Sequence, residues 1–442
     1  MSAAETVETA LAELAALHPK RIDLGLSRIE RVLKALGNPQ HKLPPTLHVA
    51  GTNGKGSTIA YVRAIAEAQG LSCHVYTSPH LVRFNERIVL ASEQINDAAL
   101  VDVLRRVRTA NAGAPLSFFE ATTAAMLLAF SETPADLSII EVGLGGRFDA
   151  TNVITPSLSA ITPIDYDHAE FLGTDLAGVA REKAGIFKAH TPAIIGAQSP
   201  LVNAVLDAEC NKLNITPKVF NEGYRAYMQH GRLVYEDETA LLDLPLPALY
   251  GSHQIQNAGL AIACARQFQF SDKAIARGLE QVVWPARMQY LTGKNTDNAL
   301  ADMVRAAGGE LWLDGGHNPH AARAIAAKMA DLEAKNPRPL ILITGMLANK
   351  DMAGYFQAFE GLASTIIGVD IPDHASHSPQ DIAALAQKHG FRGHAAHHLI
   401  DAVERAINTG EAQSRTQASQ PITPPRILIC GSLYLAGEVL KL

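Results

Sequence analysis

The residues best suited to chemistry lie between positions 46 and 58, where the chain reads Thr-Leu-His-Val-Ala-Gly-Thr-Asn-Gly-Lys-Gly-Ser-Thr. An apolar run typical of a buried strand meets three glycines, and a helical pattern starts near Ser57. Glycines allow successive backbone N–H groups to point at one anion, and a helix N-terminus adds the positive end of its dipole. Lys55 adds a mobile positive charge. These features predict a phosphate-binding loop and nucleotide-dependent chemistry.

This loop departs from the standard P-loop pattern at two points. Val49 stands where that pattern has its first glycine, and Gly56 separates Lys55 from the hydroxyl of Ser57. A glycine turn without a ligand is the alternative. The combination of Gly-Lys with a hydroxyl residue at a strand-to-helix junction favours a variant phosphate site.

Polar side chains follow three other predicted strands, at residues 73–76, 136–142 and 158–162. Ser78 follows the first of these strands, Glu141 lies at the end of the second, and His168 follows the third. The carboxyl ends of parallel strands meet at one edge of a sheet, where α/β proteins bind ligands. Mg²⁺ prefers hard oxygen ligands. Each residue alone could be an ordinary polar residue, but together they predict a metal site beside the phosphate loop.

Two further motifs are less specific. Lys183 lies in a predicted helix over residues 175–187, where the helical pattern alone indicates a solvated surface charge. The run from Asp314 to Pro319 places a carboxylate and the imidazole of His317 at a strand-to-helix turn. A capping motif is the simpler interpretation of that turn in isolation.

The elements that must position these residues alternate along the chain. Apolar, β-branched runs alternate with helical patterns, which indicates a parallel sheet covered by helices. Residues 216–250 alternate differently and predict a small antiparallel patch. We predict an α/β fold with a P-loop domain over residues 1–288 and a smaller, Rossmann-like α/β domain over residues 289–442. We expect a polar, glycine-flanked segment with one helical turn over 293–309 and a surface loop over 411–425.

The bulk composition narrows the function class. A chain of 442 residues with 47% hydrophobic and 19% charged residues is an ordered protein of more than one domain. The net charge of −6 argues against a general nucleic-acid or membrane-surface binder. The four cysteines are far apart, and no apolar run reaches the length of a membrane span. We therefore expect a cytoplasmic protein without nucleic-acid or membrane partners.

Several ordered motifs resemble one known family. They span residues 23–436, nearly the whole chain, and comprise 48–58, 78–81, 119–120, 141–147, 149–152, 167–168, 182–186, 314–319 and 431–434. This set is similar to the folate branch of the Mur ligase superfamily, that is, to folylpolyglutamate synthase and, in many bacteria, dihydrofolate synthase.

The resemblance implies an ATP-dependent amide ligase that requires Mg²⁺ and works as a monomer. ATP would phosphorylate the carboxylate of a folate-type acceptor, and the amino group of L-glutamate would attack the acyl phosphate. The matches favour two activities, on dihydropteroate and on reduced folates. The alternatives are folylpolyglutamate synthase activity alone, another Mur-type amino-acid ligase, and a nucleotide-binding protein without catalysis.

The resemblance also implies roles for individual residues. The nucleotide contacts would be Gly54, Lys55, Gly56, Ser57, Asn257, Arg287 and Asp314. The metal ligands would be Ser78, Glu141 and His168. The dihydropteroate or folate contacts would be Asp23, Leu24, Gly25, Ser117, Phe118, Phe119, Glu120, Phe148, Asp149 and Ala150. The catalytic residues would be Lys55, Lys183 as a carbamylated lysine, and His317. Glutamate would bind near His317 and Ser432.

The chain departs from the family pattern just before Arg287. Ala286 replaces the glycine that is usual there, which leaves the backbone conformation at this position open. Gly316 stands where many relatives have alanine, and the 293–309 segment is longer than usual.

Overall fold

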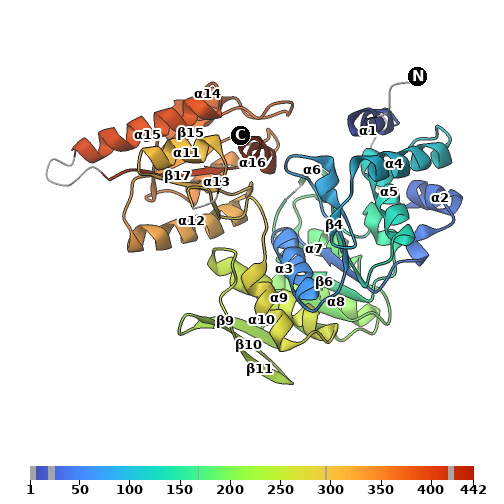
Figure 1. Ribbon diagram of the computed structural model, residues 1–442. Helices are drawn as coiled ribbons and strands as arrows, with labels where there is room; N and C mark the ends of the chain where they lie inside the picture. Colours follow the sequence, from blue (N-terminus) through green and yellow to red (C-terminus); the bar gives the residue numbers. More distant parts are fainter. Residues whose placement is uncertain (1–5, 18–24, 168, 294–295, 417–422) are drawn as a thin grey trace. The chain divides into compact units, whose positions relative to one another are not determined.

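The computed structural model describes residues 6–17, 25–167, 169–293, 296–416 and 423–442 (Figure 1). Three residues with predicted roles, Asp23, Leu24 and His168, lie outside the described residues. The chain forms two compact units, one of Met1–Ala248 with Ile255–Val282 and the other of Leu249–Gln254 with Val283–Leu442.

The first unit is built on a sheet of eight strands in the order β4-β3-β2-β5-β1-β6-β7-β8. All neighbours pair in parallel except β2–β3 and β3–β4. The strands are β1 (Thr46–Ala50), β2 (Cys73–Tyr76), β3 (Ile88–Leu90), β4 (Glu93–Gln94), β5 (Leu137–Glu141), β6 (Leu158–Ile161), β7 (Ala193–Ile195) and β8 (Lys218–Val219). Every residue of β1, β2, β5, β6 and β7 is buried, as expected for a sheet with both faces covered.

Helices cover this sheet (Figure 1). They are α1 (Val7–Ala15), α2 (Ser27–Ala35), α3 (Lys55–Ala68), α4 (Asp97–Asn111), α5 (Phe118–Glu132), α6 (Ala169–Leu172), α7 (Leu176–Ala184), α8 (Pro200–Lys212), α9 (Ser252–Gln267) and α10 (Asp272–Gln281). Side chains from α1, α2, α4 and α5 form one apolar core. Side chains of α7 and α8 form another core against the sheet.

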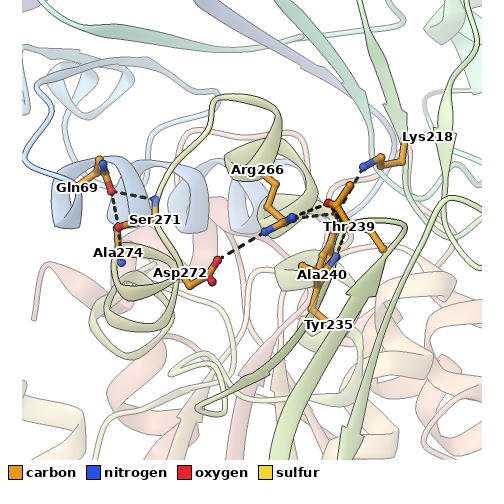
Figure 2. Close-up of polar contacts among 10 residues, drawn as sticks. Gln69, Lys218, Tyr235, Thr239, Ala240, Arg266, Ser271, Asp272 and Ala274 are labelled. Carbon is orange, nitrogen blue, oxygen red and sulfur yellow. Dashed lines mark hydrogen bonds and ion pairs between the residues drawn. The ribbon is translucent and has the colours of Figure 1, made fainter.

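A three-stranded antiparallel sheet joins the first unit through helix α9. Its strands are β9 (Tyr224–Gln229), β10 (Arg232–Asp237) and β11 (Ala240–Leu244), in the order β11-β10-β9. Figure 2 shows how it is held: Arg266 of α9 donates a hydrogen bond to Thr239 at 2.8 Å, and its Nε donates to Asp237 at 2.9 Å. Burial would raise the pKa of Asp237, but hydrogen bonds from Thr239 and Arg266 hold it well below its usual range. The ionised Asp237 side chain therefore links β10 to Arg266 of α9.

The second unit contains a six-stranded sheet in the order β12-β13-β17-β14-β15-β16. Only the β12–β13 pair is antiparallel. The strands are β12 (Gln289–Tyr290), β13 (Glu310–Leu313), β14 (Leu340–Thr344), β15 (Ala363–Gly368), β16 (Arg392–Ala395) and β17 (Arg426–Cys430). The helices are α11 (Ala299–Ala306), α12 (Pro319–Lys335), α13 (Met352–Gln357), α14 (Pro379–Lys388), α15 (Leu399–Thr416) and α16 (Leu433–Leu440).

The predicted fold class is confirmed: a mostly parallel sheet with helices, an antiparallel patch and a second α/β unit. Two local predictions were wrong. The segment 293–309 contains the eight-residue helix α11, which Asn298 caps and which buries Leu300 and Val304. Helix α15 continues to Thr416 because no proline interrupts its pattern before that point, so residues 411–416 of the predicted loop are helical. Within the described ranges, no helix has the length and apolar character needed to cross a bilayer.

Candidate functional site

The predicted phosphate loop connects β1 to α3. Gly54 has a φ of 88° and precedes the first residue of α3, Lys55, so the loop uses a backbone conformation that favours glycine. A Cβ at Gly54 would come within 2.4 Å of the Asn257 Oδ1 atom. The side chain of Asn257, from α9, therefore lies directly against the loop. Two segments predicted to contact the nucleotide are thus adjacent within the first unit.

The strand-end side chains gather beside this loop because β2, β5 and β1 are neighbours. The Lys55 ammonium donates a hydrogen bond to the Thr52 carbonyl at 3.3 Å and lies 3.9 Å from Glu141 Oε1. The backbone N–H of Ser78 donates to Glu141 Oε2 at 3.0 Å. Glu141 is 5% exposed, so its charge acts in a partly dehydrated environment.

The donor chemistry of this cluster fits a divalent cation. Glu141 offers carboxylate oxygens and Ser78 offers a hydroxyl, which are the hard donors that Mg²⁺ selects. Among the described residues there is no group of three or more His, Cys, Asp or Glu side chains that could hold a metal. A site here would therefore combine few protein ligands with ligands from substrate, as is usual for magnesium bound with a nucleotide.

Lys183 is buried, which corrects the interpretation that its helical pattern alone supports. Its ammonium donates a hydrogen bond to the Gly51 carbonyl at 2.9 Å, and the residue is 5% exposed. Burial, and after it the charge of Lys55, lower the pKa of Lys183 to about 7, although Asp167 and Asp149 act in the opposite direction. A large fraction of this amine is neutral, and hence nucleophilic, near neutral pH.

The glycine-rich segment after β5 packs against α7, the helix that contains Lys183. A Cβ at Gly146 would come within 2.6 Å of the Glu182 carbonyl oxygen, and the Arg147 N–H donates to that oxygen at 2.8 Å. Glycine at this point thus permits backbone-to-backbone contact between the loop and the helix that holds Lys183. A small cavity of about 30 Å³ remains, lined by Thr52, Lys55, Asp167, Lys183 and residues of the glycine-rich segment.

The predicted acceptor residues fall into two groups. Phe119 packs on the glycine-rich segment, because a Cβ at Gly143 would come within 2.2 Å of its ring. Phe148 is 44% exposed and follows that segment. The rings of Phe118 and Phe84 meet edge to face at 6.0 Å. Phe118, Phe119 and Phe148 thus offer aromatic surface at the start of α5 or beside the glycine-rich segment.

The other described members of the acceptor set have structural partners. Ser117 caps α5, and Glu120 accepts hydrogen bonds from the Ser117 N–H at 2.7 Å and from Arg28 Nε at 3.1 Å. Asp149 is buried and accepts from the Leu144 N–H at 2.8 Å; burial raises its pKa, and hydrogen bonds from Thr151 oppose that effect. Ala150 begins a buried 3₁₀ turn, and Gly25 has open space where a Cβ would be.

The second unit contains its own strand-end cluster after β13. Asp314 accepts hydrogen bonds from the backbone N–H groups of Met288 at 2.8 Å and Gly316 at 2.7 Å. Burial raises the pKa of Asp314, and the Arg287 guanidinium opposes this shift. The Nδ1 atom of His317 lies 3.0 Å from the Gly315 carbonyl, and Ser432 caps α16. The structure thus places Arg287, Asp314 and His317 around one turn.

The chain is similar over almost its whole length to known proteins. It is 33% identical to the folylpolyglutamate synthase of Lacticaseibacillus casei, over 93% of this chain and 92% of that protein. The chain belongs to this family of Mur ligases. Residues 49–265 match the Mur ligase middle domain, and residues 301–432 match the Mur ligase glutamate ligase domain.

Solved Mur ligases of this family share the fold. The structure of Escherichia coli FolC in complex with DHPP and ADP superposes with a TM-score of 0.85 at 28% identity, covering 100% of this chain and 98% of that one. The bifunctional folylpolyglutamate synthase/dihydrofolate synthase of Yersinia pestis, complexed with AMPPNP and Mn, gives a TM-score of 0.83 at 28% identity, covering 100% and 98%.

The structure shows the backbone conformation at Ala286, one of the positions where this Mur ligase departs from its family. Ala286, which replaces the usual glycine, has a φ of 54°, and Met288 has a φ of 44°. Such left-handed conformations cost a residue with a Cβ about 1 kcal/mol or more. The Gly315 N–H donates to the Ala286 carbonyl at 2.9 Å, and the Asp314 carboxylate holds the Met288 N–H. These bonds keep the backbone around Arg287 in the turn that a glycine would adopt without strain.

Proposed function

We propose that this Mur ligase joins L-glutamate to dihydropteroate and to reduced folates in reactions driven by ATP. The proposal is supported most directly by the crevice in which Lys55, Glu141 and Lys183 converge on the phosphate loop. The ADP and AMPPNP complexes of its structural relatives also support a nucleotide at this site. Cationic side chains and loop N–H groups suit the transfer of a phosphoryl group.

The acceptor carboxylate must be activated before an amine can attack it. A carboxylate is a poor electrophile, so an acceptor oxygen first attacks the γ-phosphorus of ATP and ADP leaves. The ammonium group of glutamate first loses a proton to solvent, and the neutral amine then attacks the acyl carbon. Inorganic phosphate leaves, and the nitrogen loses a second proton to solvent as the amide forms. Lys55 would neutralise charge on the phosphoryl group, while Gly54, Gly56, Ser57 and Asn257 would hold the nucleotide.

A divalent cation would be held by Glu141 and Ser78, with His168 as the predicted third ligand. When bound, it would neutralise phosphate charge in the crevice. In the second unit, Arg287 and Asp314 would contact the nucleotide, and His317 with Ser432 would receive glutamate.

Lys183 would act as a carbamate. Its low pKa supports this role, because only a neutral amine attacks CO₂. The addition changes a cation into an anion within a crevice that already contains Lys55. An anion there would balance the ammonium of Lys55 and support a bound metal, whereas an unmodified ammonium would repel both.

We propose that both dihydropteroate and reduced folates serve as acceptors. Asp23, Leu24, Gly25, Ser117–Glu120 and Phe148–Ala150 would bind the pterin and aminobenzoyl rings. The name of the Yersinia pestis relative supports both activities, while that of the Lacticaseibacillus casei relative supports glutamate addition to folates alone. We further propose that the enzyme works as a cytoplasmic monomer on these small molecules; its four cysteines are buried and unpaired.

One assay tests the proposal. Purified protein with ATP, Mg²⁺ and L-glutamate is given dihydropteroate or tetrahydrofolate, and both ADP and the glutamylated product are measured. We expect stoichiometric ADP and product with each acceptor. Turnover of tetrahydrofolate alone would restrict the enzyme to folylpolyglutamate synthesis. Binding of ATP without product from either acceptor would contradict the proposed function.

A further inference from the structure

A second, larger hollow lies beside the small phosphate cavity in the first unit. Its volume is about 450 Å³, within the range of about 300–1,000 Å³ that is common for small-molecule sites. Its walls include Arg147, Phe148, Phe171, Leu172 and Arg181. It thus combines two guanidinium groups with two aromatic rings that are 44% and 39% exposed.

This hollow is continuous in its lining with the phosphate cavity. Leu172 of α6 lines both cavities. Lys183 lines the smaller one, and the residue before it, Glu182, lines the larger one. A ligand whose reacting carboxylate lies beside Lys55 and Lys183 therefore has the larger hollow next to it.

The two arginines lie at long range from their carboxylate partners, and Arg147 Nη2 also donates a hydrogen bond to the Arg181 carbonyl at 3.4 Å. The Arg147 guanidinium lies 3.8 Å from a carboxylate oxygen of Glu182 and 3.9 Å from one of Glu209. Arg181 lies 3.9 Å from the Asp175 carboxylate. These separations exceed ordinary charge-assisted hydrogen bonds of about 2.7–2.9 Å, so an incoming carboxylate could form shorter bonds than the present ones. Both arginine side chains are about half exposed, at 44% and 51%.

Acceptors of the proposed reaction differ in the charge they would bring to this hollow. Dihydropteroate has one carboxylate, and that carboxylate reacts. A folate has an α-carboxylate next to the reacting γ-carboxylate, and every added glutamate contributes another. Arg181 and Arg147 can bind such non-reacting carboxylates, while Glu182 on the same wall limits the net positive charge.

We propose that Arg147 and Arg181, in the lining of this hollow, bind the non-reacting carboxylates of the acceptor's γ-glutamyl tail. Arg181 would then be a specificity residue that favours glutamylated acceptors over dihydropteroate. This inference rests on the proposed function, since that function defines the tail.

Arg181 is the better of the two arginines for a test. The backbone of Arg147 packs closely against the end of α7: a Cβ at Gly185 would come within 2.4 Å of the Arg147 Cβ. Arg181 lies on the exposed side of α7, and its guanidinium lies 3.9 Å from the Asp175 carboxylate. The Arg225→Gln variant is a matched control, because Arg225 is 59% exposed in β9 and pairs with Glu236.

The experiment measures equilibrium binding of dihydropteroate, tetrahydrofolate and tetrahydrofolate tri-γ-glutamate to the wild type, Arg181→Gln and Arg225→Gln. We expect Arg181→Gln to weaken triglutamate binding about five- to tenfold, as for a partly exposed charge-assisted contact. Its dihydropteroate affinity should stay within about twofold, and the control should match the wild type for all three ligands. Added salt should weaken triglutamate binding in the wild type more than in Arg181→Gln.

Two outcomes would overturn the inference: equal weakening of all three ligands, or no change in triglutamate affinity. Thermal unfolding of each variant shows whether equal weakening reflects damage to the fold. Wild-type turnover is measured separately, so a protein that binds the triglutamate through Arg181 but forms no product would contradict the proposed function and leave this inference supported.

Discussion

The two units each place a carboxylate at the end of a buried parallel strand, yet the two carboxylates have different surroundings. Glu141, the last residue of β5, faces the Lys55 ammonium at 3.9 Å and accepts a backbone hydrogen bond from Ser78. Asp314, after β13, accepts backbone N–H groups with both of its oxygens, at 2.8 and 2.7 Å. The first carboxylate lies beside the charged side chain of Lys55, and the second holds a turn together.

This difference indicates that the two units have different roles. In the first unit, burial and neighbouring charge act on an amine, and the pKa of Lys183 falls to about 7. In the second unit, the buried carboxylate holds the backbone N–H of Met288, directly after Arg287, and that of Gly316. We infer that the first unit supplies the reactive groups and that the second supplies a preformed turn for substrate contacts.

Loss of the Lys183 amine should have the largest effect. We expect Lys183→Ala to lower kcat by about 10²–10³-fold, since it removes an electrostatic group from a dehydrated site. The measurement is steady-state turnover with saturating substrates. A small carboxylate such as acetate should restore part of the activity by replacing the missing anion.

Lys183→Arg is the control for that prediction. It keeps a positive charge but cannot form a carbamate at physiological pH. We expect it to be as inactive as Lys183→Ala and to gain nothing from acetate. Full activity in either variant would show that the carbamate has no role.

Removal of the Glu141 charge should have the next largest effect. Glu141→Gln keeps the shape of the side chain and weakens its affinity for a cation. We expect the Mg²⁺ concentration for half-maximal activity to rise about 10–100-fold, the range seen when metal sites lose a supporting interaction. An unchanged Mg²⁺ requirement would exclude Glu141 as a ligand. Thermal unfolding without Mg²⁺ controls for structural damage.

The Asp314→Asn variant tests the other side of the comparison. An amide has one oxygen, so its NH₂ group would face a backbone N–H that the carboxylate now accepts. We expect a loss of about 1–3 kcal/mol in the free energy of unfolding of the second unit, the cost of one unsatisfied buried group. Denaturant unfolding measures this loss. Full stability with complete loss of turnover would mean that Asp314 has a chemical role instead of a structural one.

A pH dependence gives the smallest but most specific effect. Because the pKa of Lys183 is about 7 and not near 10.5, its neutral form increases as pH rises through 7. At a fixed pressure of ¹³CO₂, the carbamate signal in ¹³C NMR should therefore rise between pH 6 and 8. The same signal should be absent in Lys183→Arg. A rise only above pH 9 would show that burial does not lower the pKa.

The strand ends could be predicted because apolar runs such as Thr46–Ala50 and Leu340–Thr344 are readily recognised in the sequence. The environment of Lys183 could not. Its hydrogen-bond partner, Gly51, is 132 positions away, and the helical pattern of α7 gives no sign that this position is covered. Helix α5 was not predicted either: residues 120–130 are all buried, so the helix has no apolar stripe with a helical period to detect. The hollow around Arg181 depends on three segments meeting in space.

The central claim is that acceptor activation passes through an acyl phosphate in the crevice of Lys55 and Lys183. The most direct test uses acceptor labelled with ¹⁸O in its reacting carboxylate, with ATP, Mg²⁺ and L-glutamate, and analyses the released phosphate by mass spectrometry. We predict one ¹⁸O atom transferred to phosphate for each amide formed. Product formation with unlabelled phosphate would contradict the claim.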